Sequence, residues 1–317
     1  MTGGFHLGWG HGHVVTRDSA WAAPAWLARW GPHGGARCIP VAEYLRARAG
    51  GQIDVQRRFY AGLLMRNGVY KTTHRNRMNE LFPMLVSMAR RLETSPLRTL
   101  DVACSSGVST VEMHSAFARA GIDCEAWGSD LLIRAPHVRC DDGCAMLFDH
   151  EREPIQVEIG GWATPWRLRP RDRVLRPGRY ARARRLLELD VAQFRAALDG
   201  PVPGFVAQHV PLLSSATDGV AGVHFAEEDI FRPVVPGPFA IIRVANLLNL
   251  GYFAEDALRA MGRALCARLM PDGLLMVTRT SDAERLNRGT LFRWTGTRLE
   301  VEVTTNGGSE VTDLLLQ

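Results

Sequence analysis

The chain has 317 residues, 46% of them hydrophobic and 22% charged, with a formal net charge of +5. This composition is typical of a globular protein with one large domain and a smaller one. No run of about 18 apolar residues occurs and no basic-then-apolar segment opens the chain, which argues against a membrane span and a signal peptide. We therefore expect a cytoplasmic protein, and its six cysteines, which lack paired C-x-x-C spacing, are expected to be reduced.

The N-terminal part of the chain divides into two segments. Residues 1–38 are rich in Gly, His, Trp and Pro without periodicity, which predicts a poorly ordered segment. Residues 39–95 hold three helical patterns and are predicted to form a helical N-terminal subdomain. Pro83 is expected to begin or kink the third helix. The three patterns are VAEYLRARA, DVQRRFYAGLLMRNG and NRMNELFPMLVSMARRL.

The segment 97–130 has the pattern of a strand, a small-residue turn, a helix and a second strand. Met113, Ala116 and Phe117 fall on one face of a helix that opens at Val108, and Gly121 stands where the helix is expected to stop. The second strand ends at Asp130, and a carboxylate at that position can accept hydrogen bonds from the hydroxyls of a ribose. The pattern predicts a βαβ unit that binds a nucleoside.

The turn between the first strand and the helix reads Ala-Cys-Ser-Ser-Gly. Ala103 and Ser105 stand where G-x-G-x-x-G would require glycine, which disfavours a dinucleotide pyrophosphate. Small side chains still let a ligand approach the backbone closely. The pattern favours an adenosine ligand without a diphosphate, and S-adenosylmethionine fits that description. The alternative is an ordinary βαβ unit with a solvated Asp130.

An insertion, 136–215, separates the βαβ unit from the rest of the sheet. CAMLFD and PIQVEIGGWA predict an antiparallel hairpin, and YARARRLLELDVAQFRAALDG predicts a helix. His137, Cys140, Cys144 and His150 are candidate zinc ligands by type, but their spacings match no common zinc module, so no metal site is predicted.

Nine arginines lie between Arg167 and Arg185. They form either a solvated face or a docking surface for an acidic partner. No pattern of aromatic residues interleaved for stacking on bases is evident among them, which disfavours a nucleic-acid partner.

The chain after the insertion completes the sheet. GVHFAEEDIF predicts a strand, GPFAIIRVANLLNLGYF a strand buried on both faces, and Ala254 to Leu269 a helix. LLMVTRT predicts a further strand. TLFRW, TRLEVEVTT and SEVTDLLL stand too close together for crossover helices, which predicts a closing antiparallel hairpin.

These residues resemble those of class I S-adenosylmethionine-dependent methyltransferases, most closely the CheR-type chemotaxis methyltransferases. The similarity covers about residues 70 to 317 and includes ACSSG, a PGPF…N…YF segment and a PDGLL turn. It implies an α/β fold with a Rossmann-like, mainly parallel sheet, an antiparallel strand near one edge, and a methyltransferase domain over 96–317. Ala245 departs from the family, which has arginine there.

The resemblance implies roles for individual residues. Asp130 would hold the ribose, Asp229 and Ile230 the adenine, and the turn the methionine end, while Arg75 and neighbouring Thr73 and Arg77 would approach the methyl group. The expected cofactor-binding residues are Asp101, Ala103, Ser105, Gly107, Asp130, Leu131, Asp229, Ile230 and Asn246. The expected catalytic residues are Arg75, His74, Asn246 and Tyr252.

The leading hypothesis is an enzyme that transfers a methyl group to a carboxylate or another oxygen of a protein or small metabolite, leaving S-adenosylhomocysteine. Arg75 would position a carboxylate and Tyr252 donate a hydrogen bond, whereas a hydroxyl or amine acceptor would need His74 as proton acceptor. The alternatives are N-methylation of a small molecule and a non-catalytic S-adenosylmethionine-binding module that docks a partner.

Overall fold

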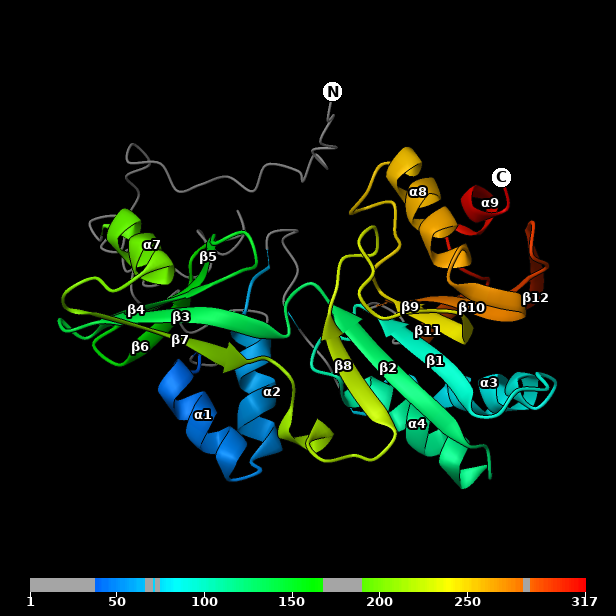
Figure 1. The fold of residues 1–317 in the computed structure, drawn as a ribbon, viewed down its shortest axis with the longest axis horizontal. Coiled ribbons are helices and arrows are strands. Elements are labelled where there is room, and N and C mark those ends of the chain that lie inside the picture. The colour runs from blue at the N-terminus through cyan, green and yellow to red at the C-terminus, as the bar shows by residue number, and fades with distance from the viewer. Residues whose placement is uncertain (1–37, 66–70, 72–74, 168–189, 282–285) are drawn as a thin grey trace. The chain divides into compact units, whose positions relative to one another are not determined.

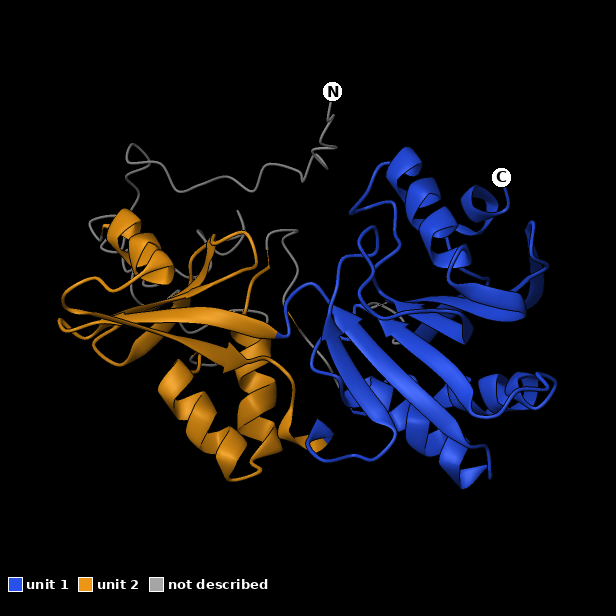
Figure 2. Cartoon of the chain, in the orientation of Figure 1, with its two compact units in different colours: residues 1–9, 74–133, 217–317 blue, residues 10–73, 134–216 orange. Residues whose placement is uncertain are grey.

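The computed structural model describes residues 38–65, 71, 75–167, 190–281 and 286–317. The chain folds into two compact units (Figure 2). Unit 1 comprises residues 1–9, 74–133 and 217–317, and unit 2 comprises residues 10–73 and 134–216. The expected helical subdomain at 39–95 is thereby divided between the units, and the poorly ordered segment predicted for 1–38 lies outside the described residues except for Cys38.

Unit 1 is built on a seven-stranded sheet whose order is β12-β11-β10-β9-β1-β2-β8 (Figure 1). The pairs β8–β2, β2–β1, β1–β9 and β9–β10 are parallel, and β11 is antiparallel to both β10 and β12. This arrangement confirms the predicted mainly parallel sheet with an antiparallel strand near one edge. The strands are β1 (Leu97–Val102), β2 (Cys124–Asp130), β8 (Val223–Glu227), β9 (Phe239–Ala245), β10 (Leu269–Ser281), β11 (Leu286–Trp294) and β12 (Leu299–Thr305).

Two buried apolar clusters cover opposite faces of this sheet. Side chains alternate along β9, so Ile241 belongs to the cluster that includes α3 and α4 residues, and Ile242 to the cluster that includes α8 residues. Burial on both faces explains the near-continuous apolar sequence of β9. The helices of unit 1 are α3 (Phe82–Ala89), preceded by η2 (Asn79–Leu81), α4 (Val108–Arg119), α8 (Glu255–Cys266) and α9 (Thr312–Leu315).

The helices follow the sequence pattern closely at their ends. Pro83 occupies the first turn of α3, where its missing N–H costs no hydrogen bond, so it begins the helix without kinking it. Met113 and Phe117 of α4 are buried, and Gly121 takes a φ of 71° just after the helix. SEVTDLLL, expected near a closing hairpin, instead contains the short helix α9, because β11 and β12 alone form that hairpin.

The described residues of unit 2 form a five-stranded antiparallel sheet in the order β6-β5-β4-β3-β7, accompanied by the helices α1, α2 and α7. The predicted hairpin of β4 and β5 is confirmed, whereas β3 and β7 were not predicted. The run PIQVEIGGWA forms two strands, because Gly160 and Gly161, with φ of 53° and 74°, separate β5 from β6. The elements are α1 (Val41–Ala49), α2 (Ile53–Gly62), β3 (Arg134–Cys140), β4 (Cys144–Phe148), β5 (Pro154–Ile159), β6 (Trp162–Pro165), α7 (Val191–Asp199) and β7 (Phe205–Pro211), followed by η3 (Ser215–Thr217).

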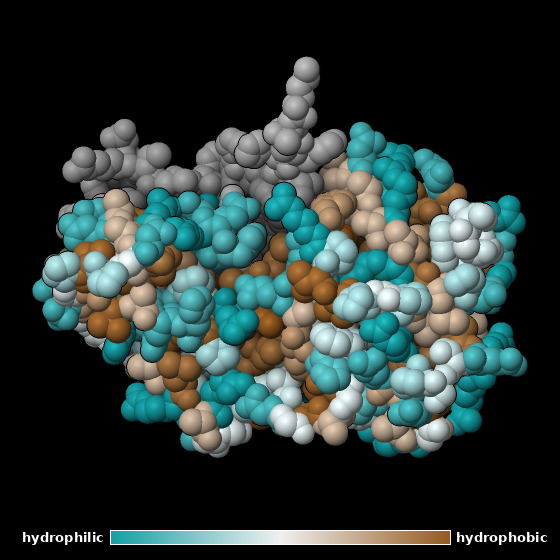
Figure 3. Space-filling view, viewed as in Figure 1, coloured by the Kyte–Doolittle hydropathy of each residue, from teal (hydrophilic) through white to brown (hydrophobic). Residues whose placement is uncertain are grey.

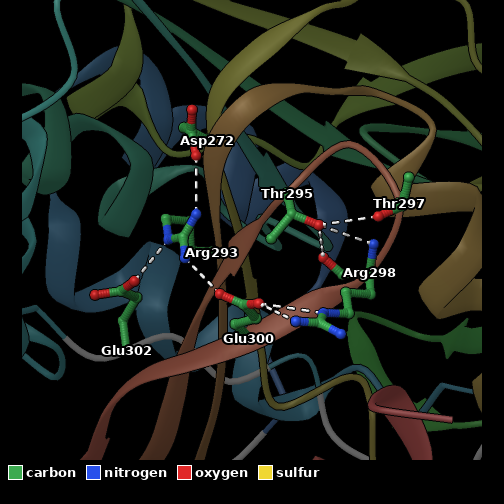
Figure 4. Close-up of polar contacts among 7 residues, drawn as sticks. All are labelled: Asp272, Arg293, Thr295, Thr297, Arg298, Glu300 and Glu302. Atoms are coloured by element: carbon green, nitrogen blue, oxygen red, sulfur yellow. Dashed lines mark hydrogen bonds and ion pairs between the residues drawn. The ribbon is translucent and has the colours of Figure 1, made fainter.

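The surface of each unit mixes hydrophilic and apolar residues on the face drawn in Figure 3. None of the helices among the described residues has both the length and the apolar character required to cross a membrane. A polar network at the edge of unit 1 ties the hairpin of β11 and β12 together (Figure 4). Arg293 in β11 pairs there with Glu300 and Glu302 of β12 and with Asp272, and these carboxylates raise its pKa, Glu302 contributing most.

Candidate functional site

The turn between β1 and α4 has an uncommon backbone. Ala103, Ser105 and Gly107 all take left-handed φ values, of 58°, 58° and 76°. A non-glycine residue in this region costs roughly 1–2 kcal/mol, so two such residues in one turn indicate strain of the kind found at ligand sites. Gly107 tolerates no side chain, because a Cβ there would lie 2.6 Å from the Phe225 ring. The turn therefore presents backbone at the carboxyl end of β1.

Asp130 ends β2 beside this turn. Its carboxylate accepts a hydrogen bond from the Ser105 N–H at 2.8 Å and another from the Leu132 N–H at 3.1 Å. Parallel strands bring their carboxyl ends to one edge, which is why an acid 25 residues away reaches the turn. Leu131, next to it, is 38% exposed and offers an apolar surface at the same edge. The structure thus brings Asp130, Leu131 and the turn together.

Asp101, expected to bind the cofactor, is turned into the protein interior. Its carboxylate is 1% exposed and forms a bidentate pair with Arg243 of β9, at 2.9 Å and 2.6 Å. Thr110 of α4 donates to the same carboxylate, and Ser109 accepts from the guanidinium at 2.7 Å. The Asp101 carboxylate therefore links β1 to α4 and β9.

A half-buried carboxyl in α4 holds the segment before η2. Glu112 accepts a hydrogen bond from the Asn76 N–H at 2.8 Å. Burial raises the pKa of Glu112, and the Asn76 hydrogen bond and the positive charges of Arg75 and Arg243 oppose that rise. Oε2 of Glu112 and Nη1 of Arg243 are both buried without a hydrogen-bond partner among the described residues. Arg75 itself is exposed, and His74 and Thr73 lie outside the described residues.

Asn246 and Arg77 both form hydrogen bonds with Thr280 of β10. Asn246 has a φ of 60° and accepts the Thr280 N–H at 2.7 Å through its side-chain oxygen. Arg77 donates from Nε to the Thr280 hydroxyl at 2.8 Å, and its carbonyl accepts from the Asn287 amide at 2.6 Å. The segment that carries Arg75 and Arg77 is thereby tied to the carboxyl ends of β9 and β10.

The two acids after β8 have different roles. Asp229 accepts the Phe231 N–H at 3.0 Å and stays within its own loop, while Ile230 packs on the core of unit 1. Glu228 is buried, pairs with Arg268 at 2.6 Å and accepts the Val234 and Val235 N–H groups. Glu228 therefore fixes the loop that presents Asp229 and Ile230.

Tyr252 lies in the loop after β9. It is half-buried against the core, with its ring edge-on to Phe253 at 6.5 Å, and its N–H donates to the Asn249 carbonyl. Asn249 is buried and accepts the Gly251 N–H through its side chain, which makes it the residue that shapes this loop.

Sequence reasoning missed Arg243, Glu112 and Thr280. The signal for Arg243 is a lone arginine inside the buried run FAIIRVA, because a buried guanidinium requires an acidic partner. Glu112 and Thr280 carry no such signal. No cluster of three or more histidine, cysteine or acidic side chains that could hold a metal ion occurs within the described parts of the chain.

Among known proteins, the chain shows similarity to solved structures only. No protein-family model matches the chain, and no curated protein matches it. The similar structures include N-methyltransferase NodS from Bradyrhizobium japonicum WM9 in complex with S-adenosyl-L-homocysteine, at 13% identity and a TM-score of 0.31 over 66% of this chain and 65% of that chain.

Two further structures are CalS10, an amino pentose methyltransferase from Micromonospora echinaspora, at 14% identity, and a protein-L-isoaspartate O-methyltransferase, at 13%. Their TM-scores are 0.28 and 0.33, over 68% and 78% of this chain and 62% and 50% of theirs. The chain thus spans less than two thirds of each of these three proteins. The assignment of the fold rests on the strand order and register of unit 1.

Proposed function

We propose that unit 1 binds S-adenosylmethionine and transfers its methyl group to an oxygen acceptor. The observation that carries the proposal is the left-handed turn at Ala103, Ser105 and Gly107 with the Asp130 carboxylate beside it, at the carboxyl edge of a parallel sheet. Ligands of open α/β sheets bind at that edge. Similarity to the CheR-type enzymes belongs to this proposal and is supported by the sequence motifs alone.

The hydrogen bonding at the turn favours an adenosine over a dinucleotide. A pyrophosphate site needs backbone N–H groups directed at the anion. Here the Ser105 N–H donates to the Asp130 carboxylate and is therefore not directed at an anion. The same carboxylate suits ribose hydroxyls, and the exposed Leu131 and half-buried Ile230 suit an uncharged purine ring. The residues present therefore fit S-adenosylmethionine.

The donor supplies an electrophilic methyl group on a sulfonium, so the protein's task is to align the acceptor and keep water away. A carboxylate acceptor is already ionised and needs no base. Arg75 is exposed beside the anchored residues Asn76 and Arg77, where a guanidinium can orient a carboxylate through paired hydrogen bonds. An acidic partner docked at Arg167 to Arg185 stays part of this proposal, and most of that segment lies outside the described residues.

Calorimetric titration with S-adenosylmethionine and with S-adenosylhomocysteine tests the ligand. Asp130→Ala is expected to weaken both affinities by about 1–3 kcal/mol, because hydrogen bonds to a charged group are lost. Asp123→Ala is the matched control, since Asp123 lies just before the amino end of β2 and is exposed. An affinity unchanged by Asp130→Ala contradicts the ribose assignment, and no binding of either compound overturns the proposal.

Methyl transfer is then measured with a radiolabelled donor against a panel of protein carboxylates, small carboxylic acids, alcohols and amines. Label in a base-labile ester supports oxygen methylation of a carboxylate, and label in an amine supports the N-methyltransferase alternative. Binding without turnover on any acceptor class supports the non-catalytic alternative.

A further inference from the structure

Unit 2 places two cysteines opposite each other at the end of a hairpin. The antiparallel register of β3 and β4 pairs Val138 with Met146 and Arg139 with Ala145. Continuing that register by one residue sets Cys140 directly across from Cys144. Gly143, with a φ of 76°, closes the turn by donating its N–H to the Cys140 carbonyl at 3.2 Å. Directly opposed residues share one face of the sheet, so the two side chains meet.

The two thiols are in contact but differ in access. A side-chain hydrogen bond links Cys140 and Cys144, and burial together with that contact raises the pKa of Cys144. Cys140 is half-buried, whereas Cys144 is 9% exposed. An entering reagent therefore meets Cys140 first, with Cys144 behind it as the second thiol.

An open groove of about 510 Å³ runs past this hairpin within unit 2. Its lining includes Cys140, Gly143 and Cys144, the cations Arg46 and Arg139, and the acids Glu43 and Asp141. A small polar molecule can reach the hairpin through it. The other cysteines, Cys38, Cys104, Cys124 and Cys266, are all buried, and none of them lines this groove. Burial raises the pKa of Cys124 and of Cys266 to about 11, which suppresses their thiolates further.

We propose that Cys140 and Cys144 form a reversible dithiol–disulfide site that reacts with low-molecular-weight disulfides of the glutathione type. The Cys140 thiolate attacks one sulfur of the disulfide, forming a mixed disulfide and releasing one thiolate. Cys144 then loses its proton to water and attacks the Cys140 sulfur, and the bond to the small thiol breaks. One small disulfide is reduced to two thiols while two protein thiols become one protein disulfide. Excess reduced thiol reverses both steps.

The experiment is thiol exchange of the full-length protein with glutathione disulfide, followed by alkylation under denaturing conditions, trypsin digestion and mass spectrometry. Trypsin cuts after Arg139 and Arg152, so one peptide carries both cysteines and no other. Oxidation is expected to leave this peptide two hydrogens lighter and unalkylated, and reduced glutathione is expected to restore two alkylation sites. The peptides that carry the other four cysteines are internal controls and are expected to stay fully alkylated.

Two variants separate the roles of the thiols. Cys144→Ser is expected to retain one glutathione on Cys140, because no second thiol displaces it, and Cys140→Ser is expected to take up none at Cys144. A wild-type peptide alkylated at both sites after treatment with a large excess of glutathione disulfide overturns the proposal, as does glutathione retained on Cys144. The wild-type result decides the matter even where a variant fails to fold, and it is independent of S-adenosylmethionine binding.

Discussion

The two sheets of this protein place their buried polar groups differently. In unit 1, Asp101, Arg243 and Thr278 are each 1% exposed and lie at or near the carboxyl ends of neighbouring parallel strands. In unit 2, His137, Gln156 and Glu158 lie across one face of an antiparallel sheet, where Gln156 donates to the Ile39 carbonyl and Glu158 accepts the Val41 N–H. The first set borders the edge at which we propose that the ligand binds, whereas the second fastens the start of α1 to the sheet.

Strand direction explains this difference. Parallel strands all end at one edge, so polar residues at their ends converge whatever their separation in sequence. Antiparallel strands end at alternating edges, so polar residues converge only where cross-strand register aligns them. A buried polar group in unit 1 is therefore a candidate for positioning a ligand. A buried polar group in unit 2 mainly holds neighbouring backbone segments together.

The largest expected effect comes from breaking the ion pair at the edge of unit 1. Asp101→Ala leaves the Arg243 guanidinium buried without its carboxylate and is expected to lower the free energy of unfolding by about 3–5 kcal/mol. Urea denaturation measures this loss. The double variant Asp101→Ala with Arg243→Met is expected to recover part of it, and a double variant no more stable than Asp101→Ala would show that the pair itself is not the cause.

The contribution of the buried His137 in unit 2 to the stability of the protein is expected to depend on pH. Burial, assisted by Arg139, lowers the pKa of His137 to about 4 from its ordinary 6.5. The unfolded chain therefore takes up a proton in a range where the native protein does not, so stability falls as pH falls from 6.5 to 4, by about 3 kcal/mol at roughly 1.4 kcal/mol per pKa unit. Urea denaturation across this range measures the slope.

His137→Gln is the variant that isolates this group. Its stability is expected to fall less steeply than that of the wild type between pH 6.5 and 4, because unfolding no longer exposes an imidazole that takes up a proton at this position. His209→Gln, at an exposed position of β7, serves as the control and is expected to keep the wild-type slope. Parallel slopes for the wild type and His137→Gln would contradict a neutral buried imidazole.

Packing behind the turn of unit 1 should show a smaller effect. A Cβ added at Gly128 would lie 2.6 Å from the Phe225 ring, so Gly128→Ala is expected to cost about 1–3 kcal/mol of unfolding free energy. Thermal unfolding followed by circular dichroism measures it. Phe225→Leu in the same background is expected to relieve the clash, whereas additive losses in the double variant would refute it.

The exposed network at Arg293 should show the smallest effect. Arg293→Gln removes contacts to Asp272, Glu300 and Glu302, and is expected to lower the midpoint of thermal unfolding slightly at low salt and still less at high salt. Calorimetry at both ionic strengths checks this. A drop in midpoint that persists at high salt would mean that the side chain contributes packing as well as charge.

Local patterns in the sequence predicted the elements whose causes are local. The α1 helix at Val41–Ala49, the start of α3 at Pro83 and the burial of β9 agree with expectation, because periodicity, proline geometry and an apolar run act over a few residues. The β3–β7 pairing was missed, since it joins segments about 70 residues apart through register that no local pattern encodes.

The candidate site divides in the same way. The sequence by itself determined that small residues at 103–107 and the acid at 130 stand at the ends of two strands, because residue type and strand pattern are written locally. Only the tertiary structure decided that the Asp101 carboxylate pairs with Arg243, 142 residues away. It also decided that Glu112 anchors the segment carrying Arg75. The left-handed backbone of Ala103 and Ser105 was likewise visible only in the structure. The physical reason is that buried charges and strained backbone conformations depend on partners that folding brings together, and those partners lie on different strands and helices.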